Sequence, residues 1–188
     1  MALTLENEFV VSAGIEPTWR LLLDLERVSR CLPGAAVEQG GEDGRLLGTM
    51  RVKLGPIAMT YNGTARLDEV DESARAAVVA VEGKETRGQG SASARIRSTL
   101  AAEGEGTRVR VETELNVTGR PAQFGRGIMQ DVAAKMLADF ADCLSRTLAE
   151  TPADEAPAPA LDLTPAVGSV FVERLRRLFR RLVVGRRS

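Results

Sequence analysis

The sequence contains no histidine among its 188 residues. This absence excludes Ser-His-Asp and Cys-His catalysis, as well as histidine-ligated metal sites. Only three lysines are present, Lys53, Lys84 and Lys135, so acid–base catalysis near neutral pH has few candidate groups. An acidic stretch at residues 68–72 lacks the ligand spacing and the glycine of a calcium loop. We therefore predict no catalytic residues and no metal site.

Cysteine is also scarce, since Cys31 and Cys143 lie far apart and form no CxxC pair. The N-terminal residues do not resemble a signal peptide, and no run approaches the ~18 uninterrupted apolar residues of a spanning helix. These features favour a cytoplasmic protein, and disulfides are rare in that compartment. We therefore expect two free, semi-buried thiols.

Acidic and basic residues are unevenly distributed. Residues 166–188 contain seven arginines and a single glutamate, although the whole chain has a net charge of −1. The remainder of the chain is therefore acidic. Such a split indicates two parts with different partners.

Residues 2–11 and most of residues 46–117 alternate between apolar and polar side chains. The clearest case is 57–68, where Met59, Tyr61 and Ala65 share one face with Gly63. Strands with one apolar and one polar face are typical of an antiparallel sheet that is covered on one side only. Before these strands, Pro17 suits the first turn of a helical segment that we expect to extend to about Arg30.

From residue 121 to residue 148 the apolar period changes to 3.6, which predicts one long helix. This helix can cover the apolar face of the sheet. The predicted fold is therefore α+β and of the helix-grip type, a curved antiparallel sheet wrapped around a long C-terminal helix. We assign it to residues 1–150.

The inward positions of the predicted strands are small, among them Gly63, Ala65, Gly83, Ala92 and Ala94, and aromatic residues make up only 4% of the chain. A long helix over such a floor can leave a void, because a filled core of native density needs bulkier groups. We predict an apolar ligand cavity, with a filled core as the alternative. The predicted cavity residues are Trp19, Leu23, Met59, Tyr61, Ala92, Phe124, Ile128, Met129, Val132, Met136 and Phe140.

The C-terminal part of the chain is predicted to be a linker followed by a helix. Residues 151–165 contain four of the eight prolines and predict an extended linker. Residues 166–188 predict a basic amphipathic helix that binds a membrane surface. Its predicted membrane-binding residues are Val170, Phe171, Arg174, Leu175, Arg177, Leu178, Phe179, Arg180, Arg181 and Leu182. A partner-docking helix and a nucleic-acid-binding helix are the alternatives, and the apolar stripe argues against nucleic acid.

Five segments, in this order, resemble the CoxG family of carbon monoxide dehydrogenase accessory proteins, within the START-like/Bet v 1-like SRPBCC superfamily. They are Trp19–Asp24, Cys31–Ala35, Leu54–Ile57, Gly88–Ala92 and Gly119–Arg126. Each segment alone is weak evidence, but together they are fairly specific. The resemblance covers about four-fifths of the chain, and the linker and the C-terminal helix lie outside it.

The resemblance implies a helix-grip domain with a hydrophobic cavity and an association with a carbon monoxide dehydrogenase or a related molybdenum hydroxylase. It also implies an accessory protein without catalytic chemistry of its own. Combined with the basic helix, it leads us to expect a peripheral protein on the inner face of the cell membrane that relays a hydrophobic ligand, such as a quinone, to the enzyme. A tether that carries no ligand and a cavity enzyme of the superfamily are the alternatives.

Overall fold

A computed structural model of the chain describes residues 1–40, 44–54 and 57–150. The chain divides into two units, Met1–Thr151 and Pro152–Ser188, and the described residues belong to the first. Its elements follow one another in the order β1 (Ala2–Val11), α1 (Ile15–Leu23), α2 (Leu25–Ser29), β2 (Ala35–Gly40), β3 (Leu46–Leu54), β4 (Ile57–Asp71), β5 (Ala76–Glu85), β6 (Ser91–Glu103), β7 (Gly106–Val117), the 3-10 helix η2 (Arg120–Phe124) and α3 (Gly125–Glu150).

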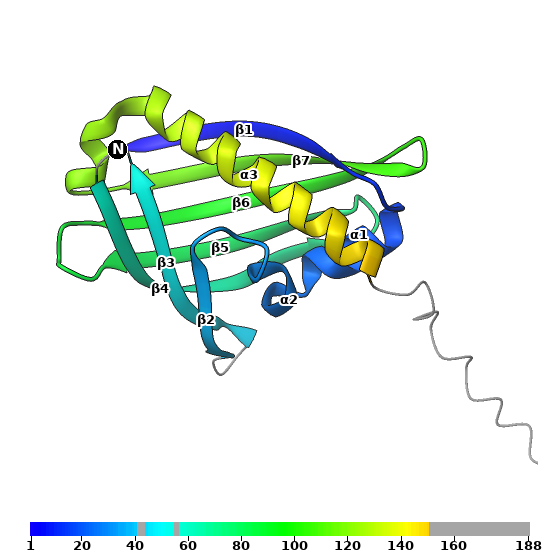
Figure 1. Ribbon diagram of the computed structural model, residues 1–188, viewed down its shortest axis with the longest axis horizontal. Coiled ribbons are helices and arrows are strands. Elements are labelled where there is room, and N and C mark those ends of the chain that lie inside the picture. The colour runs from blue at the N-terminus through cyan, green and yellow to red at the C-terminus, as the bar shows by residue number, and fades with distance from the viewer. Residues whose placement is uncertain (41–43, 55–56, 151–188) are drawn as a thin grey trace, which may run out of the picture. The chain divides into compact units, whose positions relative to one another are not determined.

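The seven strands form one sheet in the order β1-β7-β6-β5-β4-β3-β2, and every neighbouring pair is antiparallel. The strands curve around α3, which crosses one face of the sheet and lies closest to β1 (Figure 1). The predicted α+β helix-grip fold is confirmed. The predicted linker at 151–165 and the predicted amphipathic helix at 166–188 lie outside the described residues.

The two faces of the sheet differ as the alternation predicts. On the outer face Arg95 forms ion pairs with Asp68 and, at 2.7 Å, with Glu69. On the inner face of the same strand, Leu100 is buried in the core. The polar face therefore meets solvent, and the apolar face lies beneath α3.

The helical segment before β2 is divided into two short helices at Asp24. This residue ends α1, and its side chain accepts a hydrogen bond from the backbone N–H of Arg27 at 3.0 Å to begin α2. An aspartate in this role is a strong helix N-cap. The division turns the chain so that both α1 and α2 place apolar residues on the core.

Two glycines face each other where β4 and β5 approach closely. Gly63 pairs with Gly83, and a Cβ atom at Gly63 would lie 2.1 Å from the carbonyl oxygen of Glu82. No larger residue fits at position 63 without a backbone shift. The close approach leaves the centre of the inner face without side chains.

Helix α3 is connected to the sheet through η2, which has Pro121 in its first turn and ends at Gly125 with φ of +76°. The first turns of α3 are attached to β1 by polar contacts, since Arg126 donates to the carbonyl oxygen of Thr4 at 3.0 Å. Gln130 donates to the side-chain oxygen of Asn7 at 3.4 Å.

Three clusters of buried residues make up the core. The Trp19 cluster contains Val11, Trp19, Ala77, Leu100, Val109 and Val111. The Leu144 cluster contains Leu21, Val28, Cys31, Phe140 and Leu144. The Met59 cluster contains Met59, Tyr61 and Met129. The Trp19 and Met59 clusters lie toward opposite ends of the sheet, as the strand pairing of their residues shows.

Candidate ligand cavity

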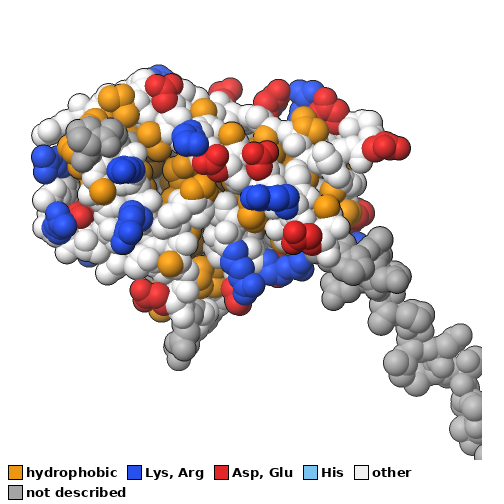
Figure 2. All heavy atoms as spheres, in the orientation of Figure 1, with side chains coloured by type: hydrophobic (Ala, Val, Ile, Leu, Met, Phe, Trp, Pro, Cys, Tyr) orange, Lys and Arg blue, Asp and Glu red, His pale blue; other side chains and the backbone are white. Residues whose placement is uncertain are grey.

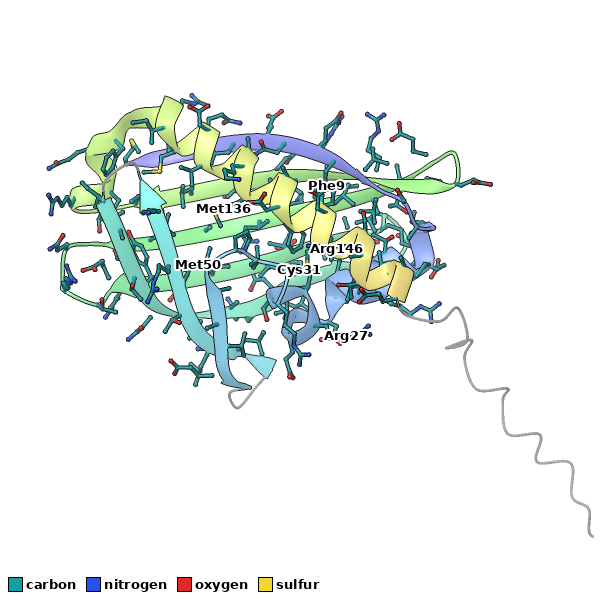
Figure 3. All side chains as sticks on the ribbon, viewed as in Figure 1. Phe9, Arg27, Cys31, Met50, Met136 and Arg146 are labelled. Carbon is teal, nitrogen blue, oxygen red and sulfur yellow. A yellow bond between two sulfur atoms is a disulfide. The ribbon has the colours of Figure 1, made fainter. Side chains whose placement is uncertain are left out.

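A cavity of about 470 Å³ lies between the sheet and α3. Residues of all three core clusters contribute to its walls, and so do α1, α2 and every strand. On the face that carries α3, apolar side chains are visible between α3 and β3 (Figure 2). Figure 3 marks Met136 on α3 and Met50 on β3, the two elements that border this region.

The floor of the cavity is made of the small residues that the sequence places inward. Gly63, Ala65, Gly83, Ala92 and Ala94 all line it. These five residues lie on the neighbouring strands β4, β5 and β6. Because none of them extends beyond Cβ, the helix spans a space that the floor does not fill.

Most of the residues predicted for the cavity wall are brought together there. The residues that line it are Trp19, Met59, Tyr61, Ala92, Met129, Val132, Met136 and Phe140. The four residues from α3 in this set follow one another at steps of three or four, so they share one side of the helix. The cavity-lining stripe therefore begins at Met129.

Three predicted cavity residues lie elsewhere. The side chain of Ile128 is 43% exposed, because it precedes Met129 by one residue and so points about 100° away from the stripe. Phe124 belongs to η2, not to α3, and packs against the outside of the Met59 cluster. Leu23, at the end of α1, packs against the Trp19 cluster and does not line the cavity. For these three residues the prediction is wrong.

The prediction also missed one side of the cavity. Val37 of β2, Met50 and Val52 of β3, and Leu25 and Leu32 beside α2 all line it. Strand β2 has only six residues and a register shift between Val37 and Gln39, so its alternation is weak. Met50 and Val52 alternate with Arg51 and are the signal that could have found this side.

Trp19 is fixed in the wall by charged groups from the turn between β4 and β5. Its indole N–H donates to a carboxylate oxygen of Glu72 at 2.7 Å, and the guanidinium of Arg75 lies 5.7 Å from the ring centroid. Arg75 is in turn paired with Glu72 and Glu16. The only tryptophan of the chain therefore has a defined position against the cavity.

The sequence model of the CoxG family of carbon monoxide dehydrogenase proteins matches residues 8–149, which is the part of the chain that builds the cavity. The chain belongs to this family. CoxG proteins are accessory proteins, generally without catalytic activity, and membership of the family implies association with a carbon monoxide dehydrogenase. A search of curated protein sequences finds no match.

Solved structures support the fold of this CoxG protein. A conserved protein from Geobacillus kaustophilus superposes with a TM-score of 0.68 at 20% identity, over 78% of this chain and 95% of that one. The protein Ara h 8.0201 gives a TM-score of 0.57 at 16% identity, over 80% of this chain and 100% of that one. Norcoclaurine synthase from Thalictrum flavum gives 0.54 at 17% identity, over 80% and 88%. At these identities the likeness concerns the fold alone.

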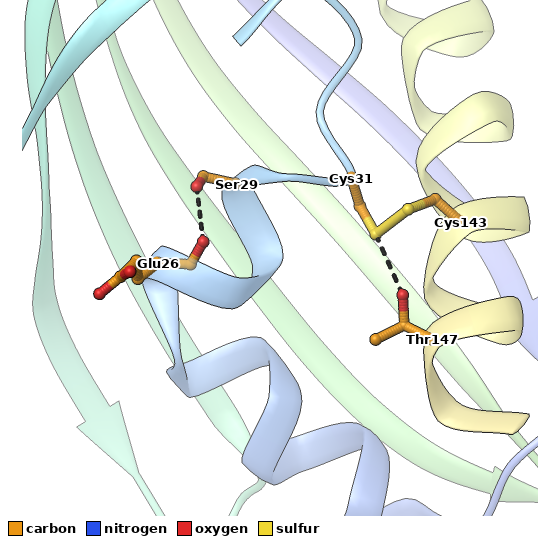
Figure 4. Close-up of a disulfide and its surroundings, with 5 residues drawn as sticks. All are labelled: Glu26, Ser29, Cys31, Cys143 and Thr147. Atoms are coloured by element: carbon orange, nitrogen blue, oxygen red, sulfur yellow. Dashed lines mark hydrogen bonds between the residues drawn. A yellow bond between two sulfur atoms is a disulfide. The ribbon is translucent and has the colours of Figure 1, made fainter. Parts of the chain in front are cut away.

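Cys31 and Cys143 form a disulfide, which contradicts the expected pair of free thiols (Figure 4). Packing within the Leu144 cluster brings the turn after α2 against α3, so the two Cα atoms lie 5.3 Å apart. That distance is within the usual range for a disulfide. Sequence separation gave no indication of it. The bond joins the second half of this CoxG protein's long helix to α2.

Two further features of the described residues bear on function. No helix in the ranges 1–40, 44–54 and 57–150 is long and apolar enough to cross a membrane. Within the same ranges, no group of three or more acidic or cysteine side chains is arranged to hold a metal ion. The cavity is therefore the site from which a function is best argued.

Proposed function

We propose that this CoxG protein is a carrier that takes a hydrophobic ligand, a quinone, from the membrane and delivers it to a carbon monoxide dehydrogenase. The observation that carries the proposal is the cavity of about 470 Å³ between α3 and the sheet. This volume is within the roughly 300–1,000 Å³ typical of small-molecule sites.

The chemistry of the wall supports an apolar ring system as the ligand. Met50, Met59, Met129 and Met136 line the cavity from three different elements. Methionine side chains adapt to irregular shapes and make favourable contacts with aromatic rings. Trp19 and Phe140 add flat apolar surface at the other end.

The C-terminal residues 166–188 supply the membrane contact in this proposal. Their apolar stripe, which includes Phe171, Leu175 and Phe179, is flanked by arginines. Each arginine contributes about 1 kcal/mol near an anionic leaflet, and each buried apolar side chain adds roughly 1.5–3 kcal/mol. We place the protein on the inner face of the cell membrane, with residues 151–165 as the connection to the carrier domain.

Electron transfer to the quinone tests the carrier function. Ala92→Phe fills the cavity from its floor, whereas Ala58→Phe adds the same bulk at an exposed position of β4 as a matched control. We expect Ala92→Phe to abolish CoxG-dependent quinone reduction by the dehydrogenase, and Ala58→Phe to preserve it. A plain tether would tolerate both changes, so full activity of the Ala92→Phe protein contradicts a carrier.

Binding itself can be followed without the enzyme. Trp19 is the only tryptophan and it lines the cavity, so its fluorescence reports on the site alone. Addition of 2,3-dimethyl-1,4-naphthoquinone to the full chain should quench this fluorescence to saturation, and Ala92→Phe should prevent the quenching. Quenching that does not saturate would count against a binding site.

Sedimentation with vesicles tests the membrane contact. The full chain should sediment with vesicles of phosphatidylglycerol and phosphatidylcholine, and a chain that ends at residue 150 should remain in the supernatant. A double change of Phe171 and Phe179 to serine should weaken binding without altering the charge. Equal sedimentation of all three proteins would remove residues 166–188 from the proposal.

A further inference from the structure

Tyr61 places a hydroxyl group against an otherwise apolar wall. It is the only tyrosine of the chain, it is 8% exposed, and it lines the cavity from the inner face of β4. Its neighbours in the Met59 cluster are Met59 and Met129. The hydroxyl therefore lies at the end of the cavity that is closed by the first turns of α3.

Within the described part of the chain, the hydroxyl of Tyr61 has a single hydrogen-bond partner, the sulfur of Met59 at 3.7 Å. A thioether sulfur is a weak acceptor. A buried hydroxyl that is poorly satisfied costs free energy, and that cost is recovered when a better acceptor arrives. The tyrosine is thus a donor without an adequate acceptor.

The nearest carboxylate does not serve as that acceptor. Glu85 pairs with Tyr61 across β4 and β5, but its carboxylate accepts from the backbone N–H groups of Arg87 at 2.7 Å and Gln89 at 3.1 Å. Burial, and then the charge of Glu85, raise the pKa of the Tyr61 phenol above its ordinary value. The phenol stays protonated and remains able to donate.

The charge of the surroundings limits what the hydroxyl can bind. Among the described residues that line the cavity there is no lysine and no arginine. An anionic head group such as a fatty-acid carboxylate would meet Glu85 without a compensating cation, and burying an unpaired charge is costly. A neutral oxygen acceptor avoids this cost.

We propose that Tyr61 is the recognition residue of the cavity and donates a hydrogen bond to the carbonyl oxygen of a neutral, otherwise apolar ligand. The inference rests on the proposed carrier function, and it narrows the ligand class to neutral carbonyl compounds, with free fatty acids excluded. On binding, the hydroxyl exchanges the Met59 sulfur for the stronger carbonyl acceptor.

A pair of probes with the same carbon skeleton tests the inference on the full chain. 2,3-Dimethyl-1,4-naphthoquinone carries two carbonyl groups, and 2,3-dimethylnaphthalene carries none. Affinities are measured by competition with the uncharged fluorescent probe N-phenyl-1-naphthylamine, for wild type and for Tyr61→Phe. The phenylalanine retains the ring and removes only the hydroxyl.

We expect Tyr61→Phe to weaken the quinone about fivefold, as for loss of one neutral hydrogen bond, and to leave the hydrocarbon unchanged. Thr113→Val is the control, because Thr113 also lines the cavity through a hydroxyl residue and should have no such selective effect. An infrared carbonyl band of the bound quinone should shift to higher frequency in Tyr61→Phe only.

The outcomes separate this inference from the carrier function. If both probes bind and Tyr61→Phe affects them equally, or affects neither, the recognition role is wrong and the carrier function stands. Binding of palmitate as tightly as the quinone would also overturn the assigned ligand class. If neither probe binds the wild-type chain, the carrier function fails and the role of Tyr61 fails with it.

Discussion

The two halves of α3 have different surroundings although they belong to one helix. In residues 125–136 only Met129 is buried, whereas residues 137–150 contain the buried Phe140, Ala141 and Leu144. The second half also carries the disulfide to Cys31 and an edge-to-face contact between Phe140 and Phe9, with ring centroids 6.0 Å apart. The first half lies over the cavity, and the second half lies on solid core.

This difference shows how one helix can both hold the fold and cover a cavity. Close packing and the covalent bond fix the second half against α2 and the Trp19 and Leu144 clusters. The first half loses part of the dispersion contact that a filled interior provides. Ligand atoms can supply that contact, so a ligand should stabilise the first half more than the second.

The largest expected effect is a truncation in the packed half. Leu144 is fully buried, so Leu144→Ala should lower the free energy of unfolding by about 3–5 kcal/mol through lost transfer energy and the new cavity. Ile128→Ala in the first half, where the side chain is 43% exposed, should change it by less than about 1 kcal/mol. Urea unfolding of both proteins measures the contrast, and equal losses would contradict it.

Removal of the disulfide is the next strongest test. Closing a long loop stabilises a protein by roughly 2–4 kcal/mol, so Cys31→Ser with Cys143→Ser should lower the free energy of unfolding by about 3 kcal/mol. Wild type unfolded in the presence of dithiothreitol is the matched control and should behave like the double variant.

The same bond can be followed in cells. Disulfides are uncommon in a reducing cytoplasm, and Cys31 is only 6% exposed. Alkylation of thiols before lysis should therefore leave Cys31 and Cys143 unmodified. Complete alkylation of both residues in native protein would show that the bond does not form there.

Enlarging one alanine in each half should have opposite effects. Ala133 lines the cavity, so Ala133→Leu should fill empty space and raise the free energy of unfolding by up to about 1 kcal/mol while it weakens ligand binding. Ala141 is 8% exposed and packed, so Ala141→Leu should lower it by about 1–3 kcal/mol through overpacking. Thermal unfolding without ligand compares the two, and a loss of stability in both would contradict an empty site.

The smallest expected effect is an alkaline one at the cavity. Because the folded pKa of Tyr61 is raised by burial and by Glu85, its contribution to stability is fully present below the unfolded pKa of about 10 and is lost as pH rises through the folded value. Phenolate absorbance of the only tyrosine should titrate above its ordinary value in folded protein and return to it in denaturant. Tyr61→Phe should lose this part of the alkaline sensitivity, and identical titrations in both states would contradict burial of the group.

Much of the fold could be predicted because its signals are local. The alternation around Met59 and Tyr61 identifies the inner face of β4, and the small residues Ala92 and Ala94 indicate a hollow floor. The stripe from Met129 to Leu144 identifies the long helix. Each of these patterns lies within one element, so chain order alone reveals it.

The features that were missed depend on how distant segments meet. The phase of α3 relative to Phe124 is set by the glycine at position 125, which separates η2 from the helix, so the step from Phe124 to Ile128 is misleading. The Cys31–Cys143 bond depends on the packing of α2 against α3. No short-range pattern in the sequence contains that information.

The alanine and glycine floor gives the domain a volume that can be adjusted in small steps. Ala65, Ala92 and Ala94 stand on paired strands whose backbone ladder does not depend on their side chains. Adding one or two methyl groups at these positions would shorten the interior from below and leave the anchored end of α3 untouched. A few substitutions of this kind are enough to refit the same scaffold to guests of different length, without inventing a new fold.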